Sequence, residues 1–257
     1  MSNNNQIDGQ LTLDFCLDTD NFVVQSNDFI NSIQTLSLNA AKILRAAIMQ
    51  IKPEDTEFGL YSITASELAD LLQVSKSNLY RDMPKLREEL MDSKIFIETH
   101  ETGEAWLSIH LLSYCALSKN KLYIKLNSDL AKYLLGLNKQ YTQIVDQEYN
   151  LFDSVYAIRL YEIILSRIML KVIPDEGLFV DIPIEEIKTL TDSHEYENAY
   201  NFKKKVLDIA MKNINMHTCY VMSYERLKLN SSKYDTVRFF VNMRYHPKKY
   251  LPQTGNI

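Results

Sequence analysis

The sequence predicts an α+β protein made of two tandem winged-helix domains that are related by a weak internal duplication. Three observations favour this fold class. The hydrophobic pattern switches between a helical period and a strand period along the chain. The order helix, helix, turn, helix, hairpin occurs once in each half. Gly and Pro number only six each among 257 residues, which argues against disorder and against a turn-dense β-sandwich.

Length and composition suit two domains of ordinary size. Apolar residues make up 46% of the chain, so each half can bury a core of its own. The polar stretch Gln140 to Asn150 is the expected boundary. The predicted parts are a flexible acidic arm over 1–21, a first winged-helix domain over 22–145, a second over 146–250, and a tail over 251–257.

A helix-turn-helix is predicted in the first half. Thr64 and Glu67 have capping-box spacing, so a first helix should begin at Ala65 and end near Gln73. After a turn of about four residues, Ser75 can cap a second helix.

The second helix carries apolar and polar residues on opposite faces. Its apolar positions are Leu79, Met83, Leu86 and Leu90. Its candidate contact residues are Ser75, Lys76, Ser77, Asn78, Arg81 and Lys85. Pro84 removes one backbone hydrogen bond inside this helix, so we expect a kink or a short break there.

Strand patterns follow the helix-turn-helix. Ile95 to His100 and Ala105 to Leu112 predict a hairpin that turns at Gly103, which gives the order of a winged helix. A third strand is expected over Lys121 to Leu126, and a short helix over Leu130 to Leu137.

The second half shows a similar order. Asp153 to Leu170 is apolar and helical, and Pro183 is well placed as the first residue of a short helix that ends at Leu190. Thr218 to Lys228 and Tyr234 to Tyr245 read as two strands of a hairpin.

Between these elements, a lysine-rich helix is predicted from Phe202 to Asn215. Its apolar stripe is Phe202, Val206, Ile209 and Ala210, at i, i+4, i+7 and i+8. Lys203, Lys204 and Lys205 are adjacent at its front, and Lys212 lies on its polar side. Such a cluster suits a polyanion such as the DNA backbone, and a solvated helix face is the alternative.

The charge distribution supports a polyanion partner despite a net charge of −5. Residues 200–250 hold eleven Lys or Arg against three Asp or Glu, whereas residues 1–60 hold three against eight. Only the surface that faces a polyanion must be basic, so this asymmetry matters more than the total.

Several kinds of chemistry lack their sequence signals. There is no GxxxxGK[ST] loop, and no two of the five His lie two residues apart, as a rolling-circle metal site would need. Cys16, Cys115 and Cys219 have no CxxC spacing, and we expect them to be reduced thiols in a cytoplasmic protein. We expect no enzyme activity, no cofactor and no metal, and no run is long enough to span a membrane.

The sequence resembles the Rep family of iteron-binding plasmid replication initiators, which act in theta replication. The resemblance covers roughly Phe22 to Met243. The matching segments are Ile63-Thr-Ala-Ser-Glu-Leu-Ala-Asp-Leu-Leu, Ser77-Asn-Leu-Tyr-Arg-Asp, Val155-Tyr-Ala-Ile-Arg-Leu-Tyr-Glu, Asn201-Phe-Lys-Lys-Lys-Val-Leu-Asp-Ile-Ala and Asn213-Ile-Asn. Pro84, and lysines where the family often has arginine, are departures from the pattern.

The resemblance implies a DNA-binding initiator with two winged-helix domains, of which the second is the main DNA-binding domain. Monomers would bind repeated origin sites, help to open the origin and recruit host replication proteins. Homodimers, pairing through the first domain, would repress the initiator's own promoter.

The resemblance also suggests how the candidate residues divide between phosphates and bases. The three adjacent lysines would hold phosphates, while Asn198, Tyr200 and Asn201 at the front of that helix could reach base edges. Asn78 is the base-reading candidate of the first domain. Arg238 and Arg244 on the last strand are candidates for the DNA backbone, with ordinary surface charge as the equal alternative.

Two other classes of function stay open at this point. One is a two-domain winged-helix repressor without initiator activity. The other is a protein-interaction module, which the acidic total favours.

Overall fold

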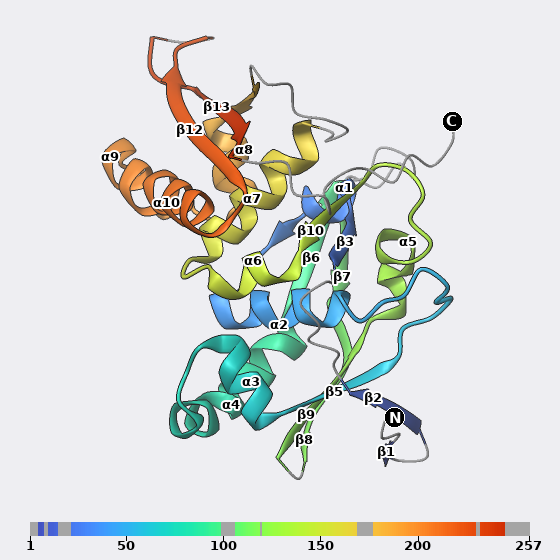
Figure 1. Cartoon of the computed structure of the whole chain (residues 1–257). Coiled ribbons are helices and arrows are strands. Elements are labelled where there is room, and N and C mark those ends of the chain that lie inside the picture. Colours follow the sequence, from blue (N-terminus) through green and yellow to red (C-terminus); the bar gives the residue numbers. More distant parts are fainter. Residues whose placement is uncertain are drawn as a thin grey trace. The chain divides into compact units, whose positions relative to one another are not determined.

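The computed structural model describes residues 5–7, 10–14, 22–98, 106–118, 120–168, 177–229 and 232–244 (Figure 1). Contacts within the chain divide it into two compact units, Met1–Asn150 and Leu151–Ile257. Each unit is described by itself below, as unit 1 and unit 2.

Unit 1 mixes helices with short sheets. Its helices are α1 (Asn27–Ile30), α2 (Leu38–Ile48), α3 (Ala65–Leu72), α4 (Lys76–Asp92), η1 (Ser128–Leu130), α5 (Ala131–Leu134) and α6 (Asp146–Leu151), whose last residue belongs to unit 2. Its strands are β1 (Asn5–Ile7), β2 (Gln10–Asp14), β3 (Phe22–Ser26), β4 (Ile33–Gln34), β5 (Leu60–Thr64), β6 (Lys94–Glu98), β7 (Trp106–His110), β8 (Leu112–Ser118), β9 (Lys121–Leu126) and β10 (Tyr141–Val145).

The helix-turn-helix of unit 1 is formed by α3 and α4, as the sequence predicts. Thr64 caps α3 by accepting from the Glu67 backbone N–H at 3.2 Å, and the Glu67 carboxylate accepts from the Thr64 backbone N–H at 3.0 Å. Gln73 ends α3 in the left-handed conformation, with φ of 55°. Ser75 then caps α4.

The helix α4 runs without interruption through Pro84, so a break at this residue is not present. Leu79, Met83, Leu86 and Leu90 are buried along one side, and this apolar stripe continues on both sides of the proline. Packing of the stripe therefore outweighs the single hydrogen bond that Pro84 removes.

The wing of unit 1 differs from the expectation. β5, the strand directly before α3, pairs with β9, and β9 pairs with β8. The wing is therefore the hairpin β8–β9, which turns at Asn120. β6 and β7 do pair, but they join β4 in a separate sheet. The predicted strand over 105–112 is divided because Leu111 bonds to Ser93 and Asn127 instead. Gly103 lies outside the described residues.

Strands also form in the expected N-terminal arm and in the expected boundary segment. β1 and β2 pair with each other, and β2 runs parallel to β5, so eight residues of the expected arm form strands. The polar stretch Gln140 to Asn150, the expected domain boundary, has regular structure and ends where the contacts divide the chain. Its β10 pairs with β3, and α6 follows directly.

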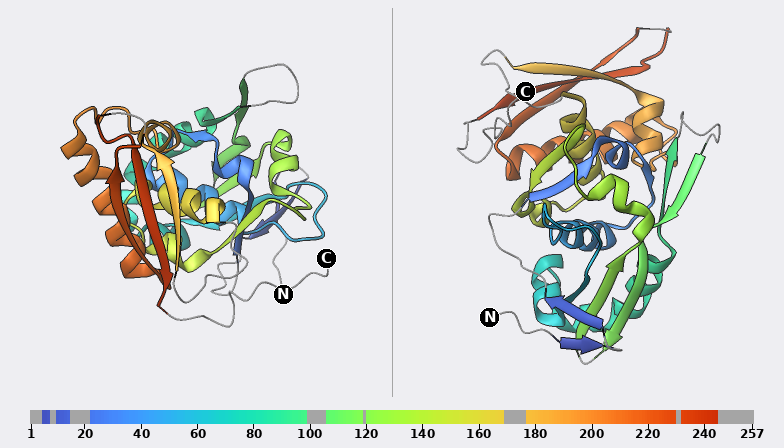
Figure 2. Two further views of the ribbon diagram at one scale, coloured as in Figure 1. Left: turned by 90° about the horizontal axis from the view of Figure 1, so that it is seen from above. Right: turned by 90° about the vertical axis from the view of Figure 1, so that its right-hand side faces the viewer.

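Unit 2 has the simpler winged-helix order. Its elements are α7 (Val155–Ile168), β11 (Leu178–Pro183), α8 (Ile184–Leu190), α9 (Ala199–Phe202), the π-helical turn η2 (Lys203–Leu207), α10 (Asp208–His217), β12 (Tyr220–Leu227) and β13 (Thr236–Met243). The strands form an antiparallel sheet in the order β11–β13–β12. This sheet lies against one side of the helices of its unit (Figure 2).

The predicted lysine-rich helix is the continuous segment α9–η2–α10, which we call the lysine helix. The π-helical turn within it shifts the phase of its buried stripe. Phe202, Val206 and Ala210 are buried as predicted, but Ile209 is only half-buried. The remaining buried apolar residues of the helix are Leu207, Met211 and Ile214.

A buried ion pair within α7 also bonds to the end of α8. Arg159 and Glu162 on α7 are 1% and 0% exposed, and Arg159 Nη1 lies 2.8 Å from Glu162 Oε2. The same guanidinium donates to the Leu190 carbonyl at the end of α8. Arg159 thus holds the two helices together and does not face solvent.

Replacing Arg159 by Met should lower the free energy of unfolding by about 3–5 kcal/mol, because the buried Glu162 carboxylate would lose its guanidinium. Urea denaturation followed by circular dichroism measures this loss. The double variant Arg159→Met/Glu162→Leu should regain part of it. Arg81→Met is the control, because the Arg81–Asp82 ion pair is exposed and should leave the urea midpoint nearly unchanged. If Arg159→Met and Arg81→Met lower the free energy of unfolding equally, Arg159 does not stabilise the fold through its buried ion pair.

Candidate nucleic-acid interface

The front of the lysine helix is exposed and capped. Asn198 accepts a hydrogen bond from the Tyr200 backbone N–H at 2.7 Å, so its side chain is used as the helix cap. Tyr200 is 59% exposed, and Asn201 is exposed beside it. The front therefore presents an aromatic ring and an amide to solvent.

Lys203 is held within the protein. Its ammonium lies 2.8 Å from Asp208 Oδ2, and the Tyr224 hydroxyl of β12 donates to Asp208 Oδ1 at 2.6 Å. Burial raises the pKa of Asp208, but the hydrogen bonds from Lys203 and Tyr224 outweigh it and hold that pKa below its ordinary value. Burial, followed by the bond to Asp208, raises the pKa of Tyr224 to about 12.

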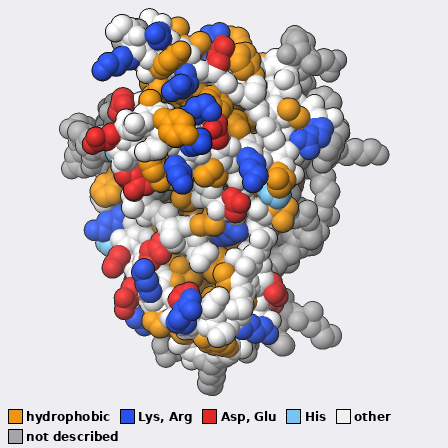
Figure 3. Space-filling model, turned by 90° about the vertical axis from the view of Figure 1, so that its left-hand side faces the viewer, with side chains coloured by type: hydrophobic (Ala, Val, Ile, Leu, Met, Phe, Trp, Pro, Cys, Tyr) orange, Lys and Arg blue, Asp and Glu red, His pale blue; other side chains and the backbone are white. Residues whose placement is uncertain are grey.

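The neighbouring lysines have different surroundings. Lys204 Nζ lies 4.8 Å from the centre of the Tyr200 ring, a cation–π contact. Lys205 and Lys212 are exposed and make no ion pair or hydrogen bond with other described residues. Lys and Arg side chains are numerous in the upper half of Figure 3, which shows a face of unit 2.

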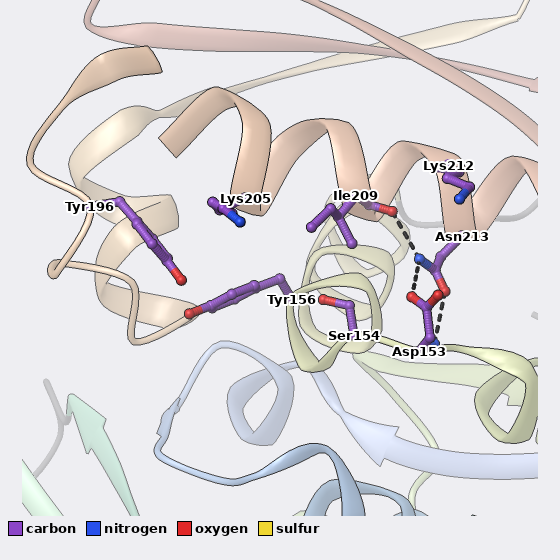
Figure 4. A pocket seen from close by; sticks show the side chains of 8 residues that line it. All are labelled: Asp153, Ser154, Tyr156, Tyr196, Lys205, Ile209, Lys212 and Asn213. Carbon is purple, nitrogen blue, oxygen red and sulfur yellow. Dashed lines mark hydrogen bonds between the residues drawn. The ribbon is translucent and has the colours of Figure 1, made fainter. Parts of the chain in front are cut away.

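A hollow of about 460 Å³ lies between the start of α7 and the lysine helix, and we call it the Lys205 pocket. It is lined by Asp153, Ser154, Tyr156, Tyr196, Lys205, Ile209, Lys212 and Asn213 (Figure 4). Asn213 donates to Asp153 Oδ1 at 2.7 Å and accepts from the Asp153 backbone N–H at 2.9 Å. This reciprocal pair fixes the lysine helix to the start of α7.

The arginines of the second wing are engaged within the protein. Arg238 makes two hydrogen bonds of 2.7 Å to Asp181 on β11 and stacks over Phe179. Arg244 donates to the Asn215 carbonyl at 2.6 Å. Arg238 therefore stabilises the sheet, and Arg244 stabilises the end of α10.

The β12–β13 hairpin carries an aromatic centre that was not predicted from the sequence. The guanidinium of Arg226 and the ammonium of Lys228 lie 4.7 and 5.0 Å from the Tyr234 ring centre. Tyr234 is half exposed, so the wing presents a basic aromatic group. The signal that could have found it is a Tyr after the predicted turn with basic residues before it.

In unit 1, the predicted contact residues share the exposed side of α4. Ser75, Lys76, Ser77, Asn78, Arg81 and Lys85 are all exposed. Ser75 Oγ accepts from the Asn78 backbone N–H at 3.2 Å, and the Arg81 guanidinium lies against Asp82. Asn78 and Lys85 are exposed and lie outside the buried stripe of α4.

A contact that the sequence did not suggest fastens α4 to the first wing. The Tyr80 hydroxyl donates to Asn120 Oδ1 at the β8–β9 turn. The Asn120 carbonyl accepts from the Ala65 backbone N–H at 2.9 Å, so one residue ties the wing turn to both helices.

Within the described part of the chain, no group of His, Cys, Asp and Glu is arranged to hold a metal ion. Over the same residues, no helix has both the length and the hydropathy for a membrane span. Cys115 is half-buried and Cys219 is buried, and neither forms a disulfide within the described part of the chain.

Family models cover most of the chain. The model described as "Initiator Replication protein, WH1" matches residues 22–165, and that described as "Initiator Rep protein, WH2" matches residues 183–241. The chain belongs to the initiator replication protein family. The two winged-helix domains predicted from the sequence are thereby confirmed.

Individual relatives are distant. An Escherichia coli "Replication initiation protein" is 21% identical over 80% of this chain, and the alignment spans 64% of that protein. An "Uncharacterized 27.6 kDa protein" of Escherichia coli is 24% identical over 79% of this chain and 88% of its own length. The crystal structure of Pi initiator protein in complex with iteron DNA matches with a TM-score of 0.69 and 18% identity, over 88% of this chain and 98% of that one.

Replacing Asp208 by Asn should flatten the loss of stability in acid. The folded-state pKa of Asp208 is lowered, so its ionised form stabilises the fold above its unfolded pKa, and this contribution is lost as pH falls through the folded pKa. Melting temperatures measured from about pH 6 to pH 2 should therefore fall less steeply for Asp208→Asn than for the natural protein.

The matched control is Glu197→Gln, which removes an exposed carboxylate that has no hydrogen-bond partner among the described residues. It should keep the natural acid profile. An Asp208→Asn profile parallel to that of the natural protein would show that the Lys203–Asp208–Tyr224 contact does not stabilise the fold.

Proposed function

We propose that this chain is a plasmid replication initiator that binds directly repeated origin sites, or iterons, on double-stranded DNA. Membership of the initiator replication protein family, over both of its domains, carries the proposal. The similar fold of the Pi initiator, whose structure is in complex with iteron DNA, supports the choice of target.

The exposed helix faces suit this target. In each domain the second helix of the helix-turn-helix enters a major groove, where side chains distinguish all four base pairs. Asn78 reads base edges in the first domain, whose expected span is 22–145. Tyr200 and Asn201 do so in the second, expected over 146–250, because the Asn198 side chain is used as a cap.

The cations divide into those with no ion pair or hydrogen bond to another described residue and those that have one. The cations that bind phosphates are Lys76 and Lys85 in the first domain and Lys204, Lys205 and Lys212 in the second. Ser77 is a further phosphate donor, and Ser75 acts mainly as the cap of α4. Lys203, Arg81, Arg238 and Arg244 already have partners within the protein, so they contact DNA only weakly or by exchanging partners.

Binding prepares the origin for the host machinery. The bound initiator bends the DNA, helps to open a nearby AT-rich region and recruits host replication proteins, as its family resemblance implies. Homodimers, pairing through the first domain, repress the initiator's own promoter. The protein works in the cytoplasm without enzyme activity or a cofactor of its own.

The direct test is footprinting of the full-length protein on DNA that flanks its gene. We expect protection of tandem repeats of about two helical turns each, because each of two domains occupies one major groove. A duplex with the same base composition in shuffled order is the control and should show no protection at the same salt concentration.

If no repeats are protected, the initiator proposal fails even if the protein binds DNA in general. If repeats are protected, the next measurement is whether a plasmid that carries this gene and no other initiator gene is maintained in cells. Maintenance would identify an initiator. Loss of the plasmid under those conditions would favour the repressor without initiator activity.

A further inference from the structure

The Lys205 pocket has an excess of positive charge that no described residue neutralises. Lys205 and Lys212 line it and have no partner among the described residues. Its one lining carboxylate, Asp153, is engaged by the Asn213 amide at 2.7 Å. The nearby Glu195 carboxylate accepts from the Tyr156 hydroxyl at 3.1 Å. An anion in the pocket therefore meets two cations whose charge is not used elsewhere.

Neutral donors lie beside these cations. Ser154 lines the pocket, and no hydrogen bond occupies its hydroxyl among the described residues. The Tyr156 and Tyr196 hydroxyls point toward one another at the same end as Lys205 (Figure 4). Burial raises the pKa of Tyr156, and the neighbouring Tyr196 and Glu195 raise it further, so its hydroxyl stays neutral.

The walls suit an anion that is joined to a carbon skeleton. Half-buried Ile209 supplies an apolar surface between the tyrosine end and the Asp153–Asn213 end (Figure 4). The volume of about 460 Å³ exceeds that of one phosphate group and leaves room for an attached sugar. The pocket also lies along the lysine helix, whose exposed residues Asn201 and Lys204 belong to the proposed DNA surface.

We propose that the Lys205 pocket binds one backbone phosphate of the DNA duplex, through the Lys205 ammonium and the hydroxyls of Ser154 and Tyr196. The adjacent deoxyribose contacts Ile209. Lys212 attracts the same strand from the other end of the pocket. This assignment rests on the proposed function, and it makes Ser154 and Tyr196, which no basic or amide pattern singles out, part of the DNA interface.

The test is a scan of the DNA backbone in which one phosphate at a time is replaced by a neutral methylphosphonate. The full-length protein binds each duplex, which carries the repeat found by footprinting. For the natural protein, substitution at the phosphate in the pocket should weaken binding about tenfold, the effect of losing a charge-assisted hydrogen bond.

Lys205→Gln should weaken binding to the unmodified duplex by a similar factor and should no longer respond to that methylphosphonate. Ser154→Ala, which keeps all charges, should reduce the same response in part. Lys204→Gln is the matched control, since Lys204 neighbours Lys205 but does not line the pocket. It should keep the full response at the pocket position.

The proposal fails if the affinity loss from Lys205→Gln and the loss from the methylphosphonate add at every position, including the pocket position. Repeat binding, and hence the proposed function, would remain intact in that case. Inorganic phosphate and a nucleoside triphosphate serve as free-ligand probes in amide NMR titrations. Saturable binding of either at the Lys205 pocket, together with no position-dependent methylphosphonate effect, would assign the pocket to a free phosphate compound and overturn the proposal. Absence of binding to any repeat would instead refute the proposed function.

Discussion

The proposed DNA surface of unit 2 depends on how the lysine helix is fixed in rotation about its own axis. Asp208 attaches one side of the helix to β12 through Tyr224, and Asn213 attaches another to the start of α7 through Asp153. The buried apolar stripe lies between these polar links. With the rotation fixed in this way, Lys204, Lys205 and Lys212 remain exposed, whereas Lys203 turns toward Asp208.

The two units meet the same requirement by different means. In unit 1, the second helix of the helix-turn-helix is fixed to its wing by the Tyr80–Asn120 contact, and Asn120 also bonds to the start of α3. In unit 2, the lysine helix is fixed to β12 by the Asp208–Tyr224 hydrogen bond and to the start of α7 by the Asn213–Asp153 pair. The internal duplication is therefore one of element order and not of stabilising contacts.

The sequence predicted what depends on local pattern. The capping box of Thr64 and Glu67, the cap at Ser75 and the alternation of β13 all follow from residues close together in the chain. It did not predict β5 or β11, because short strands with buried or mixed faces lack a distinct period. It placed the first wing one hairpin too early, because nothing local shows that Leu111 bonds to Ser93 and Asn127.

The sequence shows the residue types of the candidate site but not the surroundings of each side chain. The three adjacent lysines can be recognised from the sequence alone. That Lys203 is ion-paired and Lys205 is not depends on Asp208 and on Tyr224, which lies on a strand after the helix. The buried stripe was misplaced at Ile209 because a π-helical turn adds a residue to one turn, and the helical period assumed no such turn. The pocket residues Tyr156 and Tyr196 come from segments that show no shared pattern.

The salt dependence of DNA binding tests most directly whether the fixed rotation of the lysine helix selects the cations that meet DNA. Affinity for the repeat duplex should be measured across a range of salt concentrations for Lys205→Ala and for the double variant Lys203→Ala/Asp208→Ala. Lys205→Ala should reduce the steepness of log affinity against log salt by about 0.9, the value for one phosphate contact, while the double variant should keep the natural slope. Equal slopes for Lys205→Ala and the natural protein, or a lower slope only in the double variant, would contradict this prediction.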